Sequence, residues 1–222
     1  MRNLHDWNLS YKQAVELQKA LAPKICFTPM KKIPKLIAGT DCAFTADKKN
    51  IICCAVVLEY PNLNVIEIVH AVKKTTFPYI PGLLSFREAP ACIAAVEKIR
   101  HKPDMFMVDG QGIAHPRRLG IAAHLGLFFD KPTIGCAKSR LIGTYEPPGM
   151  AKGKCSELYD GDEVIGAVVR TKNNCKPVFV SVGNKCDLND AINSVMNCAT
   201  KFRIPEPTRL ADIEVAKIKK SL

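Results

Sequence analysis

The sequence predicts an α/β fold in which a mixed sheet, made of an antiparallel meander and parallel β-α-β strands, is flanked by helices. Two observations carry this prediction. Between residues 35 and 75, three stretches rich in Ile and Val follow one another with only short turns between them. After the Pro-rich segment 78–82, helical and strand-like patterns alternate instead. Consecutive strands favour antiparallel hairpins, whereas β-α-β alternation requires parallel strands with helices on the sheet faces.

The N-terminal half contains one helix and the meander. Ser10 can cap a helix over residues 10–22, in which apolar side chains recur at helical spacing. The three predicted strands, separated by turn residues near 47–50 and 61–62, are Lys35–Ala43, Asn50–Glu59 and Val65–Thr75.

The second half contains the β-α-β units. The predicted helices cover residues 85–100, 117–129, 187–201 and 207–220, and Pro116 stands at a plausible first helical position. The predicted strands cover residues 105–108, 133–137, 163–171 and 177–182. A meander followed by β-α-β units in one sheet is the order of elements in ribonuclease H-like folds.

The chain has 222 residues, of which 47% are hydrophobic and 24% are charged, and we expect one domain spanning residues 1–222. The net charge of +11 suits a polyanionic partner, because phosphate contacts release counterions. A protein that is merely basic is the alternative that charge alone leaves open.

Ten cysteines are present, but none are spaced Cys-x-x-Cys, and most lie in apolar runs. This pattern predicts small buried hydrophobic residues in a reducing compartment and argues against a zinc site. No apolar run is long enough for a membrane span, and we expect a cytoplasmic protein.

Asp109 is the strongest candidate for chemistry because it ends the strand 105–108, and open α/β sheets place their sites at the carboxyl ends of parallel strands. Gly110 and Gly112 follow it and allow a dinucleotide-binding loop as the rival interpretation. The third glycine of that motif is replaced by His115, and a carboxylate would repel a pyrophosphate. A metal-binding aspartate is therefore favoured.

Two further acids fit a metal-dependent hydrolase. Asp41 lies within the first strand, where a buried carboxylate needs a partner or a cation, although it could also face solvent. Glu88 lies near the start of a helix, where it could instead stabilise the helix dipole. Carboxylates, water and substrate phosphate are the ligands of Mg²⁺, with Mn²⁺ as a substitute.

Three other residues are candidates for contacts with nucleic acid. His115 and Lys138 follow the strands 105–108 and 133–137, where they could contact a phosphate or move a proton, or be ordinary cap and surface residues. Tyr79 lies between prolines in a stiff loop whose apolar tip could hold a base out of the stack. The alternative is that Tyr79 folds back over the core.

Together these residues form recognisable motifs. Pro78-Tyr79-Ile80-Pro81-Gly82 precedes Phe86-Arg87-Glu88; the long run from Asp109 through His115-Pro116-Arg117-Arg118 to Gly120 follows, and then Lys138-Ser139-Arg140-Leu141. In this order they strongly resemble the endonuclease V family, and the resemblance extends from about Ile37 to about Asp212.

The resemblance implies a ribonuclease H-like, Mg²⁺-dependent nuclease that recognises deoxyinosine in DNA, or inosine in RNA. Family members cut the second phosphodiester bond 3′ to the lesion and leave 3′-hydroxyl and 5′-phosphate ends. By the same resemblance, the metal ligands are Asp41 and Asp109, the third catalytic carboxylate is Glu88, and His115 and Lys138 lie around the scissile phosphate. The strand-separating wedge is Pro78, Tyr79 and Ile80, the base pocket is lined by backbone near Gly82, Gly110 and Gly112, and Asp212 matches a polar C-terminal position that is His in some members.

Two other classes of function remain open at this point. One is an inosine-specific ribonuclease or a non-catalytic inosine-binding factor; the other is a general ribonuclease H or junction resolvase. A binding factor would not need Asp41, Glu88 and Asp109 together, and a ribonuclease H would not need the Tyr79 loop. We expect a monomer that binds nucleic acid and no membrane.

Overall fold

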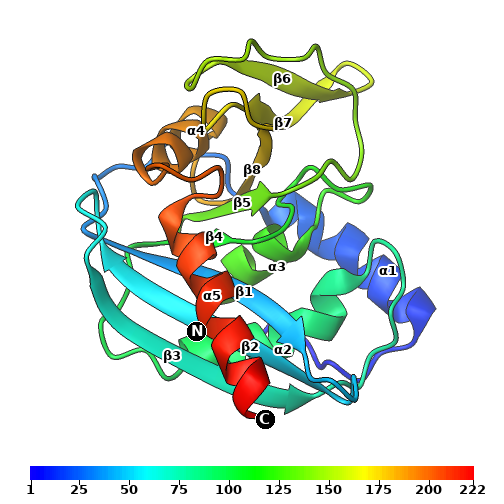
Figure 1. The fold of residues 1–222 in the computed structure, drawn as a ribbon. Helices are drawn as coiled ribbons and strands as arrows, with labels where there is room; N and C mark the ends of the chain where they lie inside the picture. The colour runs from blue at the N-terminus through cyan, green and yellow to red at the C-terminus, as the bar shows by residue number, and fades with distance from the viewer.

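The computed structural model describes residues 1–222, and its eight strands form one mixed sheet in the order β3-β2-β1-β4-β5-β8-β7-β6 (Figure 1). The strands are β1 Leu36–Phe44, β2 Asn50–Glu59, β3 Val65–Lys74, β4 Met105–Val108, β5 Thr133–Ala137, β6 Cys155–Asp160, β7 Glu163–Val169 and β8 Val178–Asn184. The antiparallel meander β1-β2-β3 continues into the parallel neighbours β1, β4 and β5, so the predicted ribonuclease H-like sheet is confirmed.

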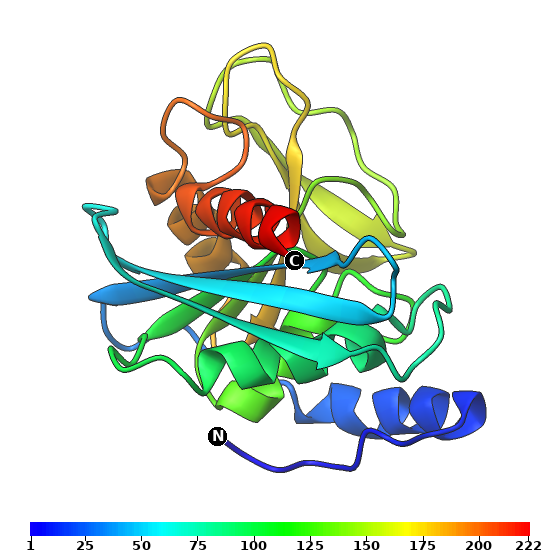
Figure 2. The ribbon, with the colours of Figure 1, turned by 60° about the horizontal axis from the view of Figure 1, so that its bottom comes forward.

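Helices cover both faces of the sheet. They are α1 Tyr11–Leu21, η1 Ala22–Lys24, α2 Leu84–Val96, α3 Ile121–Phe129, α4 Leu188–Asn197 and α5 Glu206–Ser221. In Figure 2, α4 and α5 lie on one side of the sheet, and α1, α2 and α3 lie on the other. No helix is both long enough and apolar enough to cross a membrane.

The strand β2 shows why the sheet is covered on both faces, because eight of its residues, Ile51 to Leu58, are buried without interruption. Alternate side chains enter different cores. Ile52, Cys54 and Val56 pack in the core that contains α5, whereas Ile51, Cys53 and Ala55 pack against α2 and α3.

Three predicted helices differ clearly in their bounds from the observed ones, and the helix expected over 85–100 ends at Val96. The helix expected over 117–129 begins only at Ile121, because Arg118 adopts a positive φ of 55° and closes a turn on the carbonyl of His115. Pro116 therefore lies in this turn rather than at a first helical position. The helix expected over 187–201 ends at Asn197.

The strand β6 was not predicted at all. It is an edge strand that pairs with β7 through a ladder whose register shifts between Leu158 and Tyr159, and Leu158 is its one buried residue. A strand with so little apolar burial lacks the alternation that reveals a strand in a sequence.

The helix α5 reaches β1 because Gly39 has no side chain. A Cβ built on Gly39 would lie 2.1 Å from the backbone carbonyl carbon and oxygen of Pro207, in the first turn of α5. This close approach holds the helix that carries Asp212 against the strand that carries Asp41.

We expect Gly39→Ala to destabilise the protein by roughly 1–3 kcal/mol, because a backbone rather than a flexible side chain would have to move. The measurement is the urea midpoint of unfolding. Gly149→Ala is the control, since its Cβ would meet only the side chain of Lys154, at 3.3 Å. Equal midpoints for the two variants would contradict the account.

Candidate active site

Asp109 and Lys138 meet at the carboxyl end of the parallel strands. β4 and β5 are parallel neighbours, so the residues that follow them leave the sheet at the same edge. Lys138 Nζ lies 2.6 Å from Asp109 Oδ2 and 3.5 Å from Asp212 Oδ1. One ammonium group is thus held between carboxylates from β4 and α5.

Asp41 belongs to the same acidic cluster. It shares the face of β1 with Gly39, the face on which α5 packs, and its side chain is hydrogen-bonded to Asp212. Burial, the charge of Asp109 and this hydrogen bond raise the pKa of Asp41 to about 8, although Lys138 acts in the opposite direction. Asp41 thus lies next to Asp109, the other residue that the sequence predicts to be a metal ligand.

Glu88 approaches from the opposite face of the sheet, on the second turn of α2. Burial raises the pKa of its carboxyl to about 8, and the neighbouring Cys92 and Asp109 add to this shift, while Arg87 opposes it. Stabilisation of the helix dipole needs no desolvation, so it does not explain the environment of this half-buried carboxyl.

Lys138 is the cation of the cluster. Its partial burial lowers its pKa, but the hydrogen bond to Asp109 and the charges of Asp109, Asp41 and Asp212 outweigh that effect and raise it. The lysine therefore stays charged and offsets part of the repulsion between the acids.

The four acids Asp41, Glu88, Asp109 and Asp212 suit a hard divalent cation. Three of them gather around one ammonium group, and Asp41 and Glu88 are held partly in their protonated form at neutral pH, as expected of carboxylates that lack enough positive charge. Their oxygens do not form a set of three within 4.8 Å. A small number of carboxylates completed by water and phosphate is the usual Mg²⁺ arrangement.

Asp41, Glu88 and Asp109 line part of a cavity of about 430 Å³. The rest of its wall comes from the loop before α2, the turn after β4 and the segment after β5, with Tyr79, Gly82, Gly110, Gln111, His115 and Lys138 among the lining residues. The sequence predicted these three segments separately, and the fold brings them to one opening.

The loop that carries Tyr79 is anchored at both ends. Phe77 is buried with its ring centroid 5.6 Å from that of Phe86. The carbonyl of Gly82 accepts hydrogen bonds from Gln18 Nε2 at 3.1 Å, His115 Nε2 at 3.0 Å and Arg117 Nη2 at 2.7 Å. Between these anchors Tyr79 is 69% exposed, so it does not fold back over the core.

His115 is fully engaged inside the protein. Its Nε2 donates to the Gly82 carbonyl, and its Nδ1 accepts from the Arg117 amide at 3.2 Å. Burial and the charge of Arg117 lower the pKa of His115 to about 4, so the ring is neutral. This geometry favours a role in positioning the loop over the phosphate contact or proton transfer considered from the sequence.

The two glycines after Asp109 have different surroundings. Gly110 lines the cavity with a φ of 149°, a conformation that favours glycine. Gly112 lies deeper and does not line the cavity: its amide donates to Ser181 Oγ, and its carbonyl accepts from the Gly120 amide. Gly112 thus fixes the turn rather than lining the pocket.

Three residues of this region were missed in the sequence. Gln18 and Arg117 hold the Gly82 carbonyl and also bond to each other at 2.5 Å. Gln111 donates its Nε2 to the Ser139 carbonyl, which fixes the amide orientation and leaves a buried Oε1 without a partner in the cavity wall. The orphaned acceptor could not be inferred from sequence, because a glutamine between two glycines has no distinctive pattern.

Comparisons with known proteins agree on one family. The family model described as Endonuclease V matches residues 19–213. Endonuclease V of Petrotoga mobilis is 46% identical over 97% of both chains, and that of Kosmotoga olearia is 45% identical over 100% of this chain and 97% of its own.

Solved structures match as well. The endonuclease V of Streptomyces avermitilis superposes with a TM-score of 0.92 at 37% identity, covering 97% of this chain and 95% of that one. A Ciona intestinalis endonuclease V, solved with a 23mer DNA containing an inosine followed by a ribo-adenosine, has a TM-score of 0.84 at 30% identity and covers 96% and 99% of the two chains.

Proposed function

This chain belongs to the endonuclease V family of nucleases, and we propose that it recognises deoxyinosine in DNA and hydrolyses the second phosphodiester bond on the 3′ side of the lesion, leaving 3′-hydroxyl and 5′-phosphate ends. The observation that carries the proposal is the acidic cluster of Asp41, Glu88 and Asp109 at the mouth of the cavity behind the Tyr79 loop. The complex of the Ciona relative with inosine-containing DNA supports the choice of lesion.

The cavity offers what a flipped hypoxanthine requires. Hypoxanthine differs from adenine by a ring N–H and a carbonyl at its Watson–Crick edge. The unpaired Oε1 of Gln111 can accept from such an N–H, and Gly82 and Gly110 bring backbone close without a Cβ in the way. Adenine presents an acceptor at that ring position and would leave the buried oxygen unpaired, which costs binding energy.

The residues around the acidic cluster have separable roles. Asp41 and Asp109 would hold a Mg²⁺ ion, with Asp212 close enough to Asp41 to orient it. A bound Mg²⁺ supplies charge neutralisation at the phosphate and activation of water. Glu88, held partly protonated by burial, orients the attacking water and exchanges a proton with it, and Lys138 places its ammonium against the scissile phosphate.

The Tyr79 loop and the net charge serve recognition. The exposed ring of Tyr79 enters the base stack and holds the strands apart, while the loop is held in place by the buried Phe77 and by the hydrogen bonds to the Gly82 carbonyl. The charge of +11 provides attraction to phosphate along the rest of the duplex.

We expect matched oligonucleotides with one deoxyinosine to be cut in Mg²⁺, whereas the deoxyadenosine control and reactions in EDTA are not. Asp109→Asn should reduce the single-turnover rate on the order of 100-fold or more while gel-shift binding of the lesion persists. Asp104→Asn, at the amino end of the same strand, is the control. Equal cutting of the deoxyadenosine strand would rule out the proposed specificity, and a parallel inosine RNA substrate decides between DNA and RNA as the preferred polymer.

Tyr79→Ala should weaken binding of deoxyinosine DNA by roughly 5- to 150-fold, since loss of one aromatic stacking partner costs about 1–3 kcal/mol. Fluorescence anisotropy measures the change. Phe27→Ala is the matched control, because Phe27 is 55% exposed and belongs to the segment near Cys26 and Thr28, away from this cavity. Unchanged affinity in Tyr79→Ala would remove the wedge role.

Metal affinity should rise with pH up to about pH 8, by at most about tenfold per unit. The affinity rises with pH because of Asp41. Its pKa of about 8 means that the carboxyl is protonated at pH 6.5, and binding of a cation must release that proton. Calorimetric titration with Mg²⁺ or Mn²⁺ between pH 6.5 and 9 measures the slope, and Asp41→Asn should flatten it. An affinity that is constant with pH in the unaltered protein would show that Asp41 is not a ligand.

A further inference from the structure

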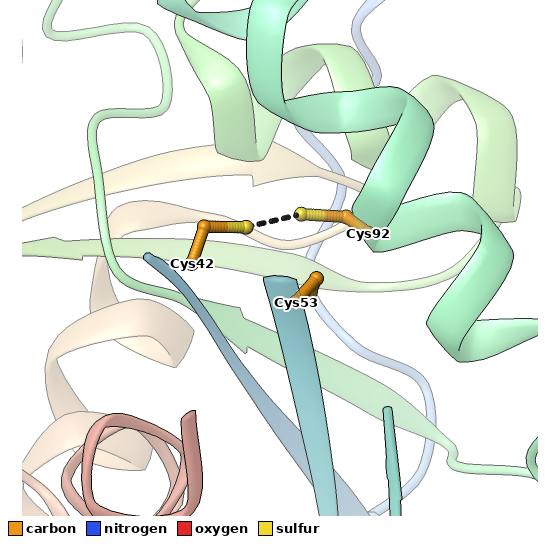
Figure 3. Close-up of side chains that lie close together, drawn as sticks. All are labelled: Cys42, Cys53 and Cys92. Atoms are coloured by element: carbon orange, nitrogen blue, oxygen red, sulfur yellow. Dashed lines mark hydrogen bonds between the residues drawn. The ribbon is translucent and has the colours of Figure 1, made fainter. Parts of the chain in front are cut away.

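Three cysteines from separate elements converge on the face of the sheet that α2 covers. Cys42 of β1 and Cys53 of β2 stand directly opposite each other in the antiparallel ladder, so their side chains point to the same face. Cys92 of α2 lies over them, and in Figure 3 the sulfurs of Cys42 and Cys92 face each other, with the Cys53 side chain next to them. All three Sγ atoms lie within 4.8 Å of one another, and those of Cys42 and Cys92 are 3.3 Å apart.

We propose that Cys42, Cys53 and Cys92 form a binding site for a soft, thiophilic cation that takes three sulfur ligands, and that Cu(I) is the ion whose chemistry fits it. The three cysteines lie far apart in the sequence, so no sequence motif reveals the site. Cys-x-x-Cys spacing is needed only where ligands are close in sequence, and here the fold brings distant cysteines together.

The dimensions of the cluster match such an ion. Metal–sulfur bonds of about 2.3 Å place three sulfurs of a planar site about 4 Å apart. The Sγ–Sγ distance of 3.3 Å between Cys42 and Cys92 lies below that value, and the limit of 4.8 Å for all three pairs lies above it. Side-chain rotations that move the sulfur atoms by a fraction of an ångström therefore accommodate the ion. No movement of β1, β2 or α2 is required.

The donor set selects the ion. No carboxylate or imidazole joins the three sulfurs within the same distance. Structural zinc sites almost always use four ligands, and Mg²⁺ requires oxygen, whereas thiolates without other donors favour Cu(I). Cys53 and Cys92 belong to an apolar core that also includes Ala55, Ala89 and Ala95.

Binding is a ligand exchange without a redox step. Cu(I) enters in that oxidation state, thiol protons leave to solvent, and Cu–S bonds replace the S–H bonds that are lost. Hydrogen bonds from the Cys42 and Cys53 thiols lower the pKa of Cys92. Cys42 is only half-buried and provides the side from which the ion enters.

An ion bound at this site is connected to the acidic cluster along the backbone at two points. Cys42 follows Asp41 in β1, and Cys92 lies one helical turn after Glu88 on the same side of α2. The ion would fix α2 to β1 and β2 at this point and hold negative thiolates near Glu88, whose pKa Cys92 already raises. We therefore expect bound Cu(I) to inhibit cutting; this consequence rests on the proposed nuclease function, whereas the binding site does not.

The test begins with binding. The reduced full-length protein is titrated anaerobically with Cu(I) buffered by bicinchoninate, and X-ray absorption at the copper edge reports the ligands. One equivalent with three sulfurs at about 2.3 Å is expected. Cys53→Ala and Cys92→Ala should weaken affinity by more than the roughly 10–100-fold that follows from altering a group that merely orients a ligand. Cys186→Ala is the control, because Cys186 is buried but belongs to a different core.

Each outcome decides one part of the proposal. Equal losses in Cys186→Ala and Cys92→Ala, unchanged affinity in both cluster variants, or spectra dominated by oxygen and nitrogen would overturn the site. Thermal unfolding of the copper-free variants confirms that they are folded, and Cys92→Ser provides a second variant of equal size. If copper binds the cluster but deoxyinosine cutting is undiminished, the inhibition is refuted and the site stands. If the protein cuts no inosine substrate at all, the nuclease proposal fails and the binding result is unaffected.

Discussion

The organising constraint in this structure is the concentration of negative charge at the carboxyl end of the central strands. Asp41, Asp109 and Asp212 surround a single ammonium group, that of Lys138, and Glu88 is buried behind them. Carboxylates this close repel one another, and burial penalises their charged forms further. The protein relieves the conflict by keeping protons on two of them, which leaves a cluster poised to exchange protons for a divalent cation.

The two faces of the sheet carry different functional residues. Along β1, Gly39 and Asp41 face α5, while Cys42 faces α2, so adjacent residues of one strand serve different layers. α5 delivers Asp212 only because Gly39 lets its first turn touch the strand, and α2 delivers Glu88 from the other side. The loop before α2 is tied to the turn after β4 through the Gly82 carbonyl, which connects the exposed Tyr79 loop to the segment that follows Asp109.

Much of this site could be predicted from the sequence, and the failures have physical causes. Asp109 and Lys138 follow buried apolar strands, and the rule that parallel strands share a carboxyl edge places them together. The side of the sheet that Asp41 faces depends on register, which periodicity alone does not fix. His115 was expected near a phosphate, yet its contacts are with Gly82 and Arg117, because tertiary hydrogen bonds between distant segments leave no local pattern.

The raised pKa values of Asp41 and Glu88 also mean that the acidic cluster lowers the stability of the folded protein at neutral pH. A carboxyl whose pKa is raised to about 8 contributes most to folding below its unfolded value near pH 4, and that contribution is lost as the pH rises through 8. At neutral pH the folded protein therefore forgoes part of the stability that an apolar site would give it. A ligand that binds the ionised acids in the folded state, and not in the unfolded state, stabilises the folded protein by mass action and so restores the lost free energy of unfolding. Binding of a cation and tightening of the α2–β1–α5 layers are thus expected to be one coupled event, because the same carboxylates join those elements.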